Sequence, residues 1–150
     1  MLKGRIDADL KTAMLGGDKF LTEVLRGLKS AILYKEVALK KRDEGLSDAE
    51  IEQLFASEAK KRDESAALFE QGGNQESADK ERREKEIILG YLPTQLSEGD
   101  IAVIVDEEVQ KLGENGPQAM GKVIGAVKSR TGSTADGAII ARIVKTKLGV

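Results

Sequence analysis

Apolar residues recur along the whole chain at the three- and four-residue spacing of amphipathic helices, and nowhere in the strict alternation of a half-buried strand. Seven such stripes are separated by glycines, prolines and capping residues, which end one helix and begin the next. We therefore predict an all-α protein. The expected helices are, by residue number, about 2–15, 19–41, 48–71, 75–92, 98–112, 117–131 and 134–148.

A proline-containing segment is expected to divide the chain. Pro93 lacks an amide donor and restricts the residue before it, so a helix that arrives there should stop. Ser97 is followed three residues later by Asp100, which is the spacing of a capping box at the start of a new helix. We predict an N-terminal four-helix subdomain over residues 1–95 and a C-terminal three-helix bundle over residues 96–150.

The composition limits the chemistry that is available to the chain. Charged residues make up 33% and hydrophobic residues 40%, and no apolar run approaches the roughly 18 residues that span a bilayer. We expect a cytoplasmic protein with no membrane partner. The sequence has neither cysteine nor histidine, which removes thiolate chemistry, Cys-ligated zinc and the commonest general base. We expect no catalytic residues of its own, no cofactor and no metal.

One short motif has the spacing of a catalytic pair. Ser77 and Lys80 match S-x-x-K, but the companion motifs of serine–lysine enzymes are absent and the neighbouring residues are charged. A solvated helix surface is the better interpretation of this motif.

Charge is distributed unevenly along the sequence. Residues 47–116 carry eight Lys and Arg against eighteen Asp and Glu, whereas residues 117–150 carry six against Asp136 alone, a net charge of +5. An acidic middle followed by a basic end indicates that an anionic partner would bind the C-terminal bundle.

The most specific local feature is the stretch Met120–Gly125. Gly121 and Gly125 lie four residues apart, so on a helix they leave a bare groove on one face, with Lys122 beside it. Such a groove serves either close packing of another helix of the bundle or close approach of a nucleic-acid backbone. Gly27, inside the second expected helix, is likewise expected to lie close to a neighbouring helix.

Further basic residues lie on the last two expected helices. Lys128 and Arg130 end one helix, and Arg142 and Lys145 lie off the apolar stripe of the next. They could form a phosphate-binding patch, although charge alone fits a solvated surface equally well. No aromatic residue in this part of the chain could stack on bases, so recognition would rest on phosphates and shape. The RNA-binding candidates are Gly121, Lys122, Gly125, Lys128, Arg130, Arg142 and Lys145.

Four stretches together resemble one known family. They are Leu25–Ile32, Tyr91–Ser97, Met120–Gly125 and Ala135–Gly137. On these residues the chain is identified as a member of the GatB/YqeY family, the stand-alone relatives of the tail domain of the glutamine-dependent aminoacyl-tRNA amidotransferase B subunit. The resemblance implies an all-helical fold, tRNA as a partner, and a family-level association with carbon–nitrogen ligase activity that uses glutamine as amido-N-donor. A stand-alone tail would lack the catalytic centre.

Three functions stay open from the sequence. The preferred one is a tRNA-interacting accessory module that contacts phosphates through the basic bundle. The second is a helical protein–protein adaptor whose acidic residues 47–92 dock a basic partner. The third is a non-catalytic component of an amidotransferase complex, with amidotransferase subunits or an aminoacyl-tRNA synthetase as partners.

Overall fold

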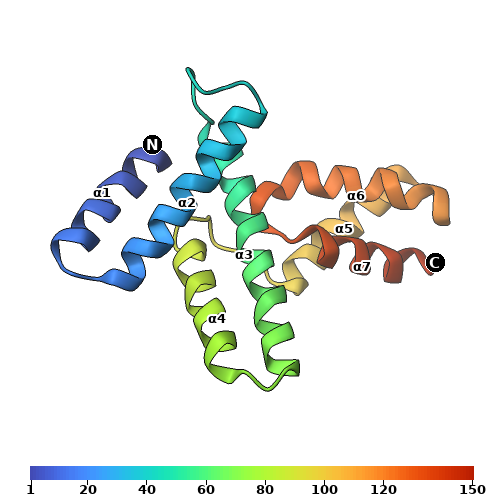
Figure 1. The fold of residues 1–150 in the computed structure, drawn as a ribbon. Coiled ribbons are helices and arrows are strands. Elements are labelled where there is room, and N and C mark those ends of the chain that lie inside the picture. The colour runs from blue at the N-terminus through green and yellow to red at the C-terminus, as the bar shows by residue number, and fades with distance from the viewer. The chain divides into compact units, whose positions relative to one another are not determined.

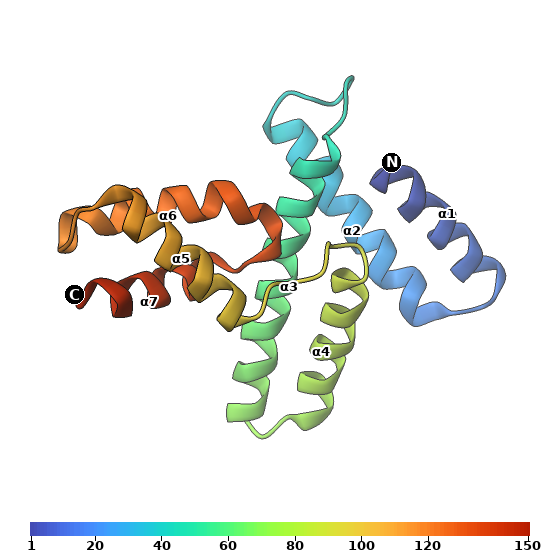
Figure 2. The same ribbon diagram turned by 180° about the vertical axis from the view of Figure 1, so that it is seen from behind.

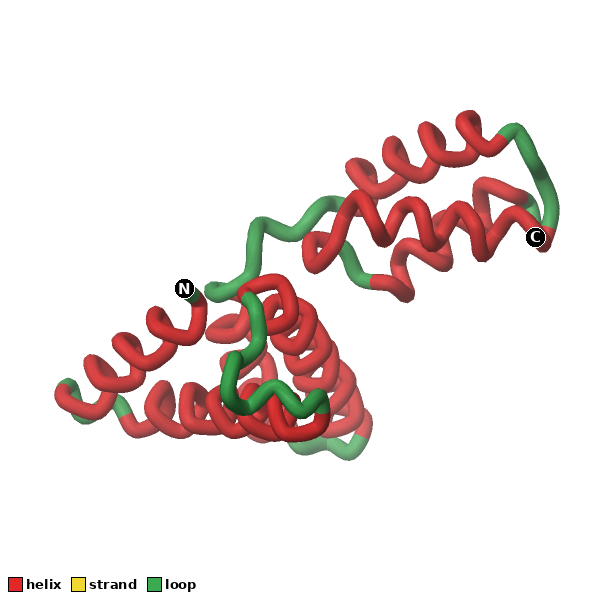
Figure 3. The backbone as a smooth tube through the Cα atoms, turned by 90° about the horizontal axis from the view of Figure 1, so that it is seen from above, coloured by secondary structure: helices red, strands yellow, loops and turns green.

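The computed structural model describes residues 1–150, which form helices and connecting turns with no strand; this confirms the all-α prediction (Figure 1). The elements are α1 (Leu2–Leu15), α2 (Lys19–Ala38), α3 (Asp48–Gln71), α4 (Gln75–Leu89), α5 (Glu98–Leu112), α6 (Pro117–Thr131), the 3₁₀ turn η1 (Gly132–Thr134) and α7 (Gly137–Leu148). Figure 3 shows the same helices as a tube with the loops between them. None of these helices combines the length and the apolar character needed to cross a lipid bilayer. The chain divides into two compact units, residues 1–92 (unit 1) and residues 93–150 (unit 2).

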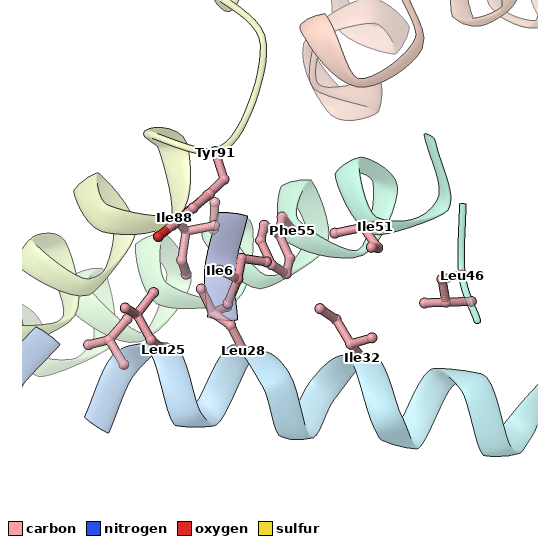
Figure 4. Packing of buried hydrophobic residues seen from close by; sticks show 11 residues of the cluster. Ile6, Leu25, Leu28, Ile32, Leu46, Ile51, Phe55, Ile88 and Tyr91 are labelled. Carbon is pink, nitrogen blue, oxygen red and sulfur yellow. The ribbon is translucent and has the colours of Figure 1, made fainter. Parts of the chain in front are cut away.

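Unit 1 is built around one face of α2. Leu25, Leu28 and Ile32 repeat at helical spacing and are almost completely buried. Figure 4 shows these three side chains directed at residues of the other helices of the unit. Those residues are Ile6 of α1, Ile51 and Phe55 of α3, Ile88 of α4, and Tyr91 in the turn after α4. Each large aliphatic side chain buried in this way contributes about 1.5–3 kcal/mol of transfer free energy, so this face of α2 organises the whole unit.

The end of α2 differs from the expectation, because the helix stops before Lys41. Lys40 adopts the left-handed backbone conformation, with φ at 57°, and the Lys41 amide donates back to the Glu36 carbonyl at 2.8 Å. The buried Glu36 carboxylate then holds the following loop, accepting from Lys3 Nζ at 2.6 Å and from the Leu46 amide at 3.3 Å. The hydrogen bond from Lys3 lowers the pKa of Glu36 below its ordinary value, which keeps this buried group charged.

The end of α4 also comes earlier than expected, at Leu89 rather than near Leu92. The amides of Tyr91 and Leu92 donate to carbonyls three residues back, at 3.0 and 3.1 Å, so the chain tightens after the helix. Pro93 follows, and a proline disfavours the helical conformation for the residue before it. Pro93 has no amide to continue the helical hydrogen bonds, so the chain leaves the helix before it reaches the proline.

Tyr91 fastens the end of α4 to two other helices. Its hydroxyl donates to Asp9 Oδ2 of α1 at 2.5 Å, and its ring meets Phe55 of α3 edge to face, with centroids 6.0 Å apart. The Arg5 guanidinium lies 4.7 Å from the centroid of the tyrosine ring and donates to the Gly90 carbonyl at 3.0 Å. Burial, together with the Asp9 carboxylate, raises the pKa of the Tyr91 phenol, so it stays protonated and donating.

Helices α3 and α4 form an antiparallel pair joined by the turn at residues 72–74 (Figure 2). Ala59, Ala66 and Ala78 are buried, and their small side chains let the two helices approach closely. Ion pairs cross the interface between the helices: Arg62 with Glu84, Lys85 with Asp63, and Arg82 with Glu70. The charge-rich start of α4 is therefore used inside the hairpin as well as in solvent.

Unit 2 encloses a separate aliphatic core between α5, α6 and α7. Its fully buried members are Ile101, Val105, Val123, Val127, Ile140 and Val144. The side-chain amide of Gln95 donates to the Ser133 carbonyl at 3.0 Å. The Leu96 amide donates to the Thr134 carbonyl at 2.8 Å, and the Leu96 side chain packs on this core. These contacts fix the start of unit 2 to the turn between α6 and α7.

The Tyr91 contacts predict that removing the tyrosine hydroxyl lowers the stability of the protein. Tyr91→Phe should lower the free energy of unfolding by about 1–2 kcal/mol, because the buried hydroxyl donates to a carboxylate. Chemical denaturation checks this value. Tyr34→Phe is the matched control, since Tyr34 is 78% exposed, and it should change stability by less than about 0.5 kcal/mol. Equal effects of the two substitutions would contradict the role given to Tyr91.

The contacts of Glu50 at the start of α3 predict a contribution to stability that depends on pH. It completes a capping box with Ser47 and pairs with Lys41 at 2.5 Å, and the hydrogen bond from Lys41 lowers the pKa of Glu50 from 4.5 to about 2. A lowered pKa means that the stabilisation is present above pH 4.5 and is lost as the pH falls toward 2. Glu50→Gln should therefore melt below the wild type at pH 7, and the gap should close between those pH values. Glu64→Gln, an exposed position, serves as control, and a gap that stays constant with pH would refute this account.

Candidate nucleic-acid interface

The predicted RNA-binding residues all lie on α6 and α7, which run antiparallel in unit 2 (Figure 1). The core side of α6 is formed by Ala119, Val123 and Val127, which are buried. All seven candidates are exposed: Gly121, Lys122, Gly125, Lys128 and Arg130 on α6, and Arg142 and Lys145 on α7. Exposure alone does not separate binding residues from a solvated surface, so their contacts decide what each can do.

Gly121 and Gly125 form a bare stretch on α6, which we call the glycine face. A Cβ atom placed on either residue would have no heavy atom within 4 Å, apart from the helix itself and chain neighbours. Close packing of another helix of the bundle on these glycines is therefore the wrong alternative. The expectation that a helix passes close to Gly27 is wrong for the same reason. What stays possible at the glycine face is a ligand that needs close access to a helix backbone.

Lys128 lies next to the glycine face and reaches the start of α7. A Cβ at Gly137 would meet Lys128 Cε at 3.2 Å and Nζ at 3.4 Å, so the ammonium group lies beside the first residue of α7. The Asp136 carboxylate already caps that end of α7, accepting from the Ala138 amide at 2.6 Å. Lys128 and Lys145 form no ion pair within the protein, so both charges are available to a ligand.

Arg130, in contrast, is a structural clamp. Its Nη1 lies 2.7 Å from Glu107 Oε2 and 3.1 Å from Glu108 Oε1, both on α5. The Glu108 side chain is only 12% exposed, and the hydrogen bond from Arg130 lowers the pKa of Glu108. Arg130 is thus held between two carboxylates and joins α6 to α5. It is not available for phosphate without disturbing the bundle.

The other two cations are paired, but on the surface. Lys122 Nζ lies 3.1 Å from Glu114 Oε2, and Arg142 pairs with Glu98 at the first residue of α5. Every side chain in these two pairs is more than half exposed, between 52% and 61%. Exposed pairs of this kind contribute little to stability and exchange readily with other ions.

The charge of the whole unit corrects the sequence-based picture. The count of +5 covered residues 117–150 only, whereas unit 2 begins at residue 93 and includes the acidic helix α5. Over residues 93–150 there are seven Lys and Arg and seven Asp and Glu, so the unit is neutral. The bundle is therefore not a basic surface as a whole. Its free positive charge is local, at Lys128 and Lys145.

The comparison with known families agrees with the markers in the sequence. A family model described as Yqey-like protein matches residues 3–148 of the chain. The chain belongs to this family. A search of curated proteins found no match. Membership confirms the family resemblance and supports a helical module similar to the amidotransferase tail domain.

The Yqey-like fold gives no catalytic geometry to the S-x-x-K motif. Ser77 and Lys80 line an open surface hollow together with Phe20 and Arg83, and no hydrogen bond joins the serine to the lysine. The Ser77 amide is used in capping α4, where it donates to Asn74 Oδ1 at 3.0 Å. No group of three or more acidic side chains in the chain is placed to hold a metal ion.

Sequence reasoning missed Glu98 and Glu114, which decide how many of the candidate cations are free. Both lie outside the basic segment, and Glu98 is 44 residues from Arg142. The four-residue spacing of the stripes predicts three packed helices but not which carboxylate faces which cation. A helical-wheel comparison of α5 with α7 could have indicated that acidic residues on one helix face basic residues on the other.

The open glycine face predicts that alanine stabilises α6. Gly121→Ala and Gly125→Ala should each raise the free energy of unfolding by about 0.5–1 kcal/mol, because both sites have helical backbone and free space for a methyl group. Thermal and denaturant unfolding of each variant checks the sign. A loss of stability would instead indicate that something packs on these glycines. Gly27→Ala, in unit 1, provides a control with the same geometry.

Proposed function

We propose that this member of the Yqey-like family is a cytoplasmic tRNA-interacting accessory module, related to the tail domain of glutamine-dependent aminoacyl-tRNA amidotransferase and without a catalytic centre of its own. The observation that carries the proposal is the glycine face, which is open and lies beside an unpaired lysine. Glycine costs helix stability, so two exposed glycines with room for a side chain favour a ligand that uses the space.

The chemistry of this surface suits a nucleic-acid backbone. A bare helix face lets sugar and phosphate groups approach the peptide backbone, and Lys128 and Lys145 supply charges that no carboxylate of the protein holds. Unit 2 contains no aromatic residue, so stacking on unpaired bases has no support. The surface favours recognition of a folded RNA through its shape and phosphates. Two free cations supply only a modest electrostatic attraction, so the fit at the glycine face must contribute as well.

The other two functions have less support from the contacts. An adaptor that uses residues 47–92 needs free carboxylates, but many there already pair with basic residues of the same hairpin, such as Glu84 with Arg62 and Asp63 with Lys85. A role in an amidotransferase complex, with its subunits or an aminoacyl-tRNA synthetase, is compatible with tRNA contact. In such a complex the chain would supply RNA contacts while the carbon–nitrogen ligase chemistry lies in other proteins.

Removing the two free cations tests the electrostatic part of the proposal. Lys128→Ala/Lys145→Ala should weaken binding of bulk tRNA by about tenfold at 0.1 M salt and reduce the salt slope by up to about two, since each lost phosphate contact contributes about 0.9. Fluorescence anisotropy over a salt series measures both quantities. Lys11→Ala/Lys19→Ala removes two exposed lysines of unit 1 and should leave binding nearly unchanged. Absence of tRNA binding by the wild type at low salt would refute the function.

Filling the glycine face tests the shape part. Gly121→Ala/Gly125→Ala should weaken tRNA binding by about tenfold, or about 1.4 kcal/mol, while leaving the salt slope unchanged because no charge is lost. The same variant is expected to be more stable than the wild type, so weaker binding cannot come from unfolding. Unchanged tRNA affinity in this folded variant would remove the glycine face from the interface.

A further inference from the structure

We propose that Glu98 and Glu114 determine the ligand specificity of unit 2, because their carboxylates occupy Arg142 and Lys122 until a well-fitting RNA backbone displaces them. This inference rests on the proposed function and concerns the same surface. It adds two acidic residues to the interface, which a search for basic patches passes over. The cations of the surface then fall into two groups: Lys128 and Lys145 are free, whereas Lys122 and Arg142 are gated by a carboxylate.

The positions of the two carboxylates suit such a gate. Glu98 is the first residue of α5, and Glu114 follows shortly after the last residue of the same helix. The two acids therefore lie at opposite ends of α5, and one meets a cation of α7 while the other meets a cation of α6. Each of α6 and α7 therefore has one cation that is paired with a carboxylate, either from the first residue of α5 or from the loop that follows α5.

The exposure of these pairs separates gating from structural support. Arg130 bridges Glu107 and Glu108 at 38% exposure of its own side chain, and Glu108 is only 12% exposed. The side chains of the two gated pairs are all more than half exposed, so solvent and ions reach them and the bundle does not depend on them. A phosphate can replace either carboxylate without opening the core.

The consequence is discrimination between polyanions. A featureless polyanion meets a neutral unit with two free cations, so it gains little. A folded RNA that also fits the glycine face gains backbone contacts, and these offset the separation of the carboxylates from their cations. Specificity then arises because the wrong ligands are disfavoured as well as because the right one is favoured.

The experiment neutralises the two acids without changing their shape. Glu98→Gln/Glu114→Gln is compared with Glu23→Gln/Glu64→Gln, which makes the same change of net charge at exposed positions of unit 1. The probes are heparin, a mixed-sequence DNA duplex and bulk tRNA, each titrated over a salt series. The Glu98→Gln/Glu114→Gln variant should bind heparin and duplex DNA about tenfold more tightly than the control variant, with a salt slope for the duplex larger by up to about two. Its affinity for tRNA should rise less, so the preference for tRNA falls.

A second variant shows whether the gain passes through the released cations. Adding Lys122→Gln and Arg142→Gln to the Glu98→Gln/Glu114→Gln variant should return heparin binding to the level of the control. If the Glu98→Gln/Glu114→Gln variant and the control bind heparin equally, or if the gain in heparin affinity survives loss of these cations, the gating inference is refuted. A gain for heparin with no tRNA binding by any variant would refute the proposed function and leave the gate as a screen against polyanions. If tRNA binding is normal and heparin affinity does not rise, the gate is refuted and the proposed function stands.

Discussion

The aliphatic face of α2 holds unit 1 together, because Leu25, Leu28 and Ile32 meet side chains from each of the other three helices. A chain with so few aromatic residues has to bury many medium-sized side chains, and it does so along one continuous seam. The ends of the helices are then free to carry polar fastenings. Glu36 holds the loop after α2, and Tyr91 holds the end of α4.

Unit 2 is also organised around one aliphatic core, which is smaller and lies between three helices. Its three helices share a seam of valine and isoleucine, and carboxylates of α5 meet cations of α6 and α7 on either side of it. The pairs are not equivalent. The Arg130 clamp is partly buried and ties two helices together, whereas the pairs of Lys122 and Arg142 are exposed. The same chemical contact therefore stabilises the bundle at one place and adjusts its surface charge at another.

The helices could be predicted from the sequence because their signals are local. The capping residues Ser47 and Ser97 and the stop at Gly113 place helix ends within a residue or two, since each acts on its own neighbours. The early end of α4 depends on Pro93 and on the packing of Tyr91, so only part of its cause is local. Which cations of the candidate site are paired with carboxylates could not be predicted in the same way.

Which cations are free depends on the register between helices that are far apart in sequence. The pairing of Arg142 with Glu98 spans 44 residues, and a charge count over a chosen segment treats the two as unrelated. The glycine stretch left two interpretations open, because spacing on a helix gives a face but not the neighbour of that face. The open space around Gly121 and Gly125 removed the helix-packing interpretation, which no property of the residues themselves could have done.

The uneven placement of aromatic residues has an optical consequence. Both tyrosines, Tyr34 and Tyr91, and all three phenylalanines belong to unit 1, and the chain has no tryptophan. Near-ultraviolet absorbance, tyrosine fluorescence and near-ultraviolet circular dichroism therefore report on unit 1 alone, with Tyr91 as the buried reporter and Tyr34 as the solvated one. Far-ultraviolet circular dichroism reports on the helices of both units. The protein thus carries an intrinsic means of following one unit separately from the other without a label.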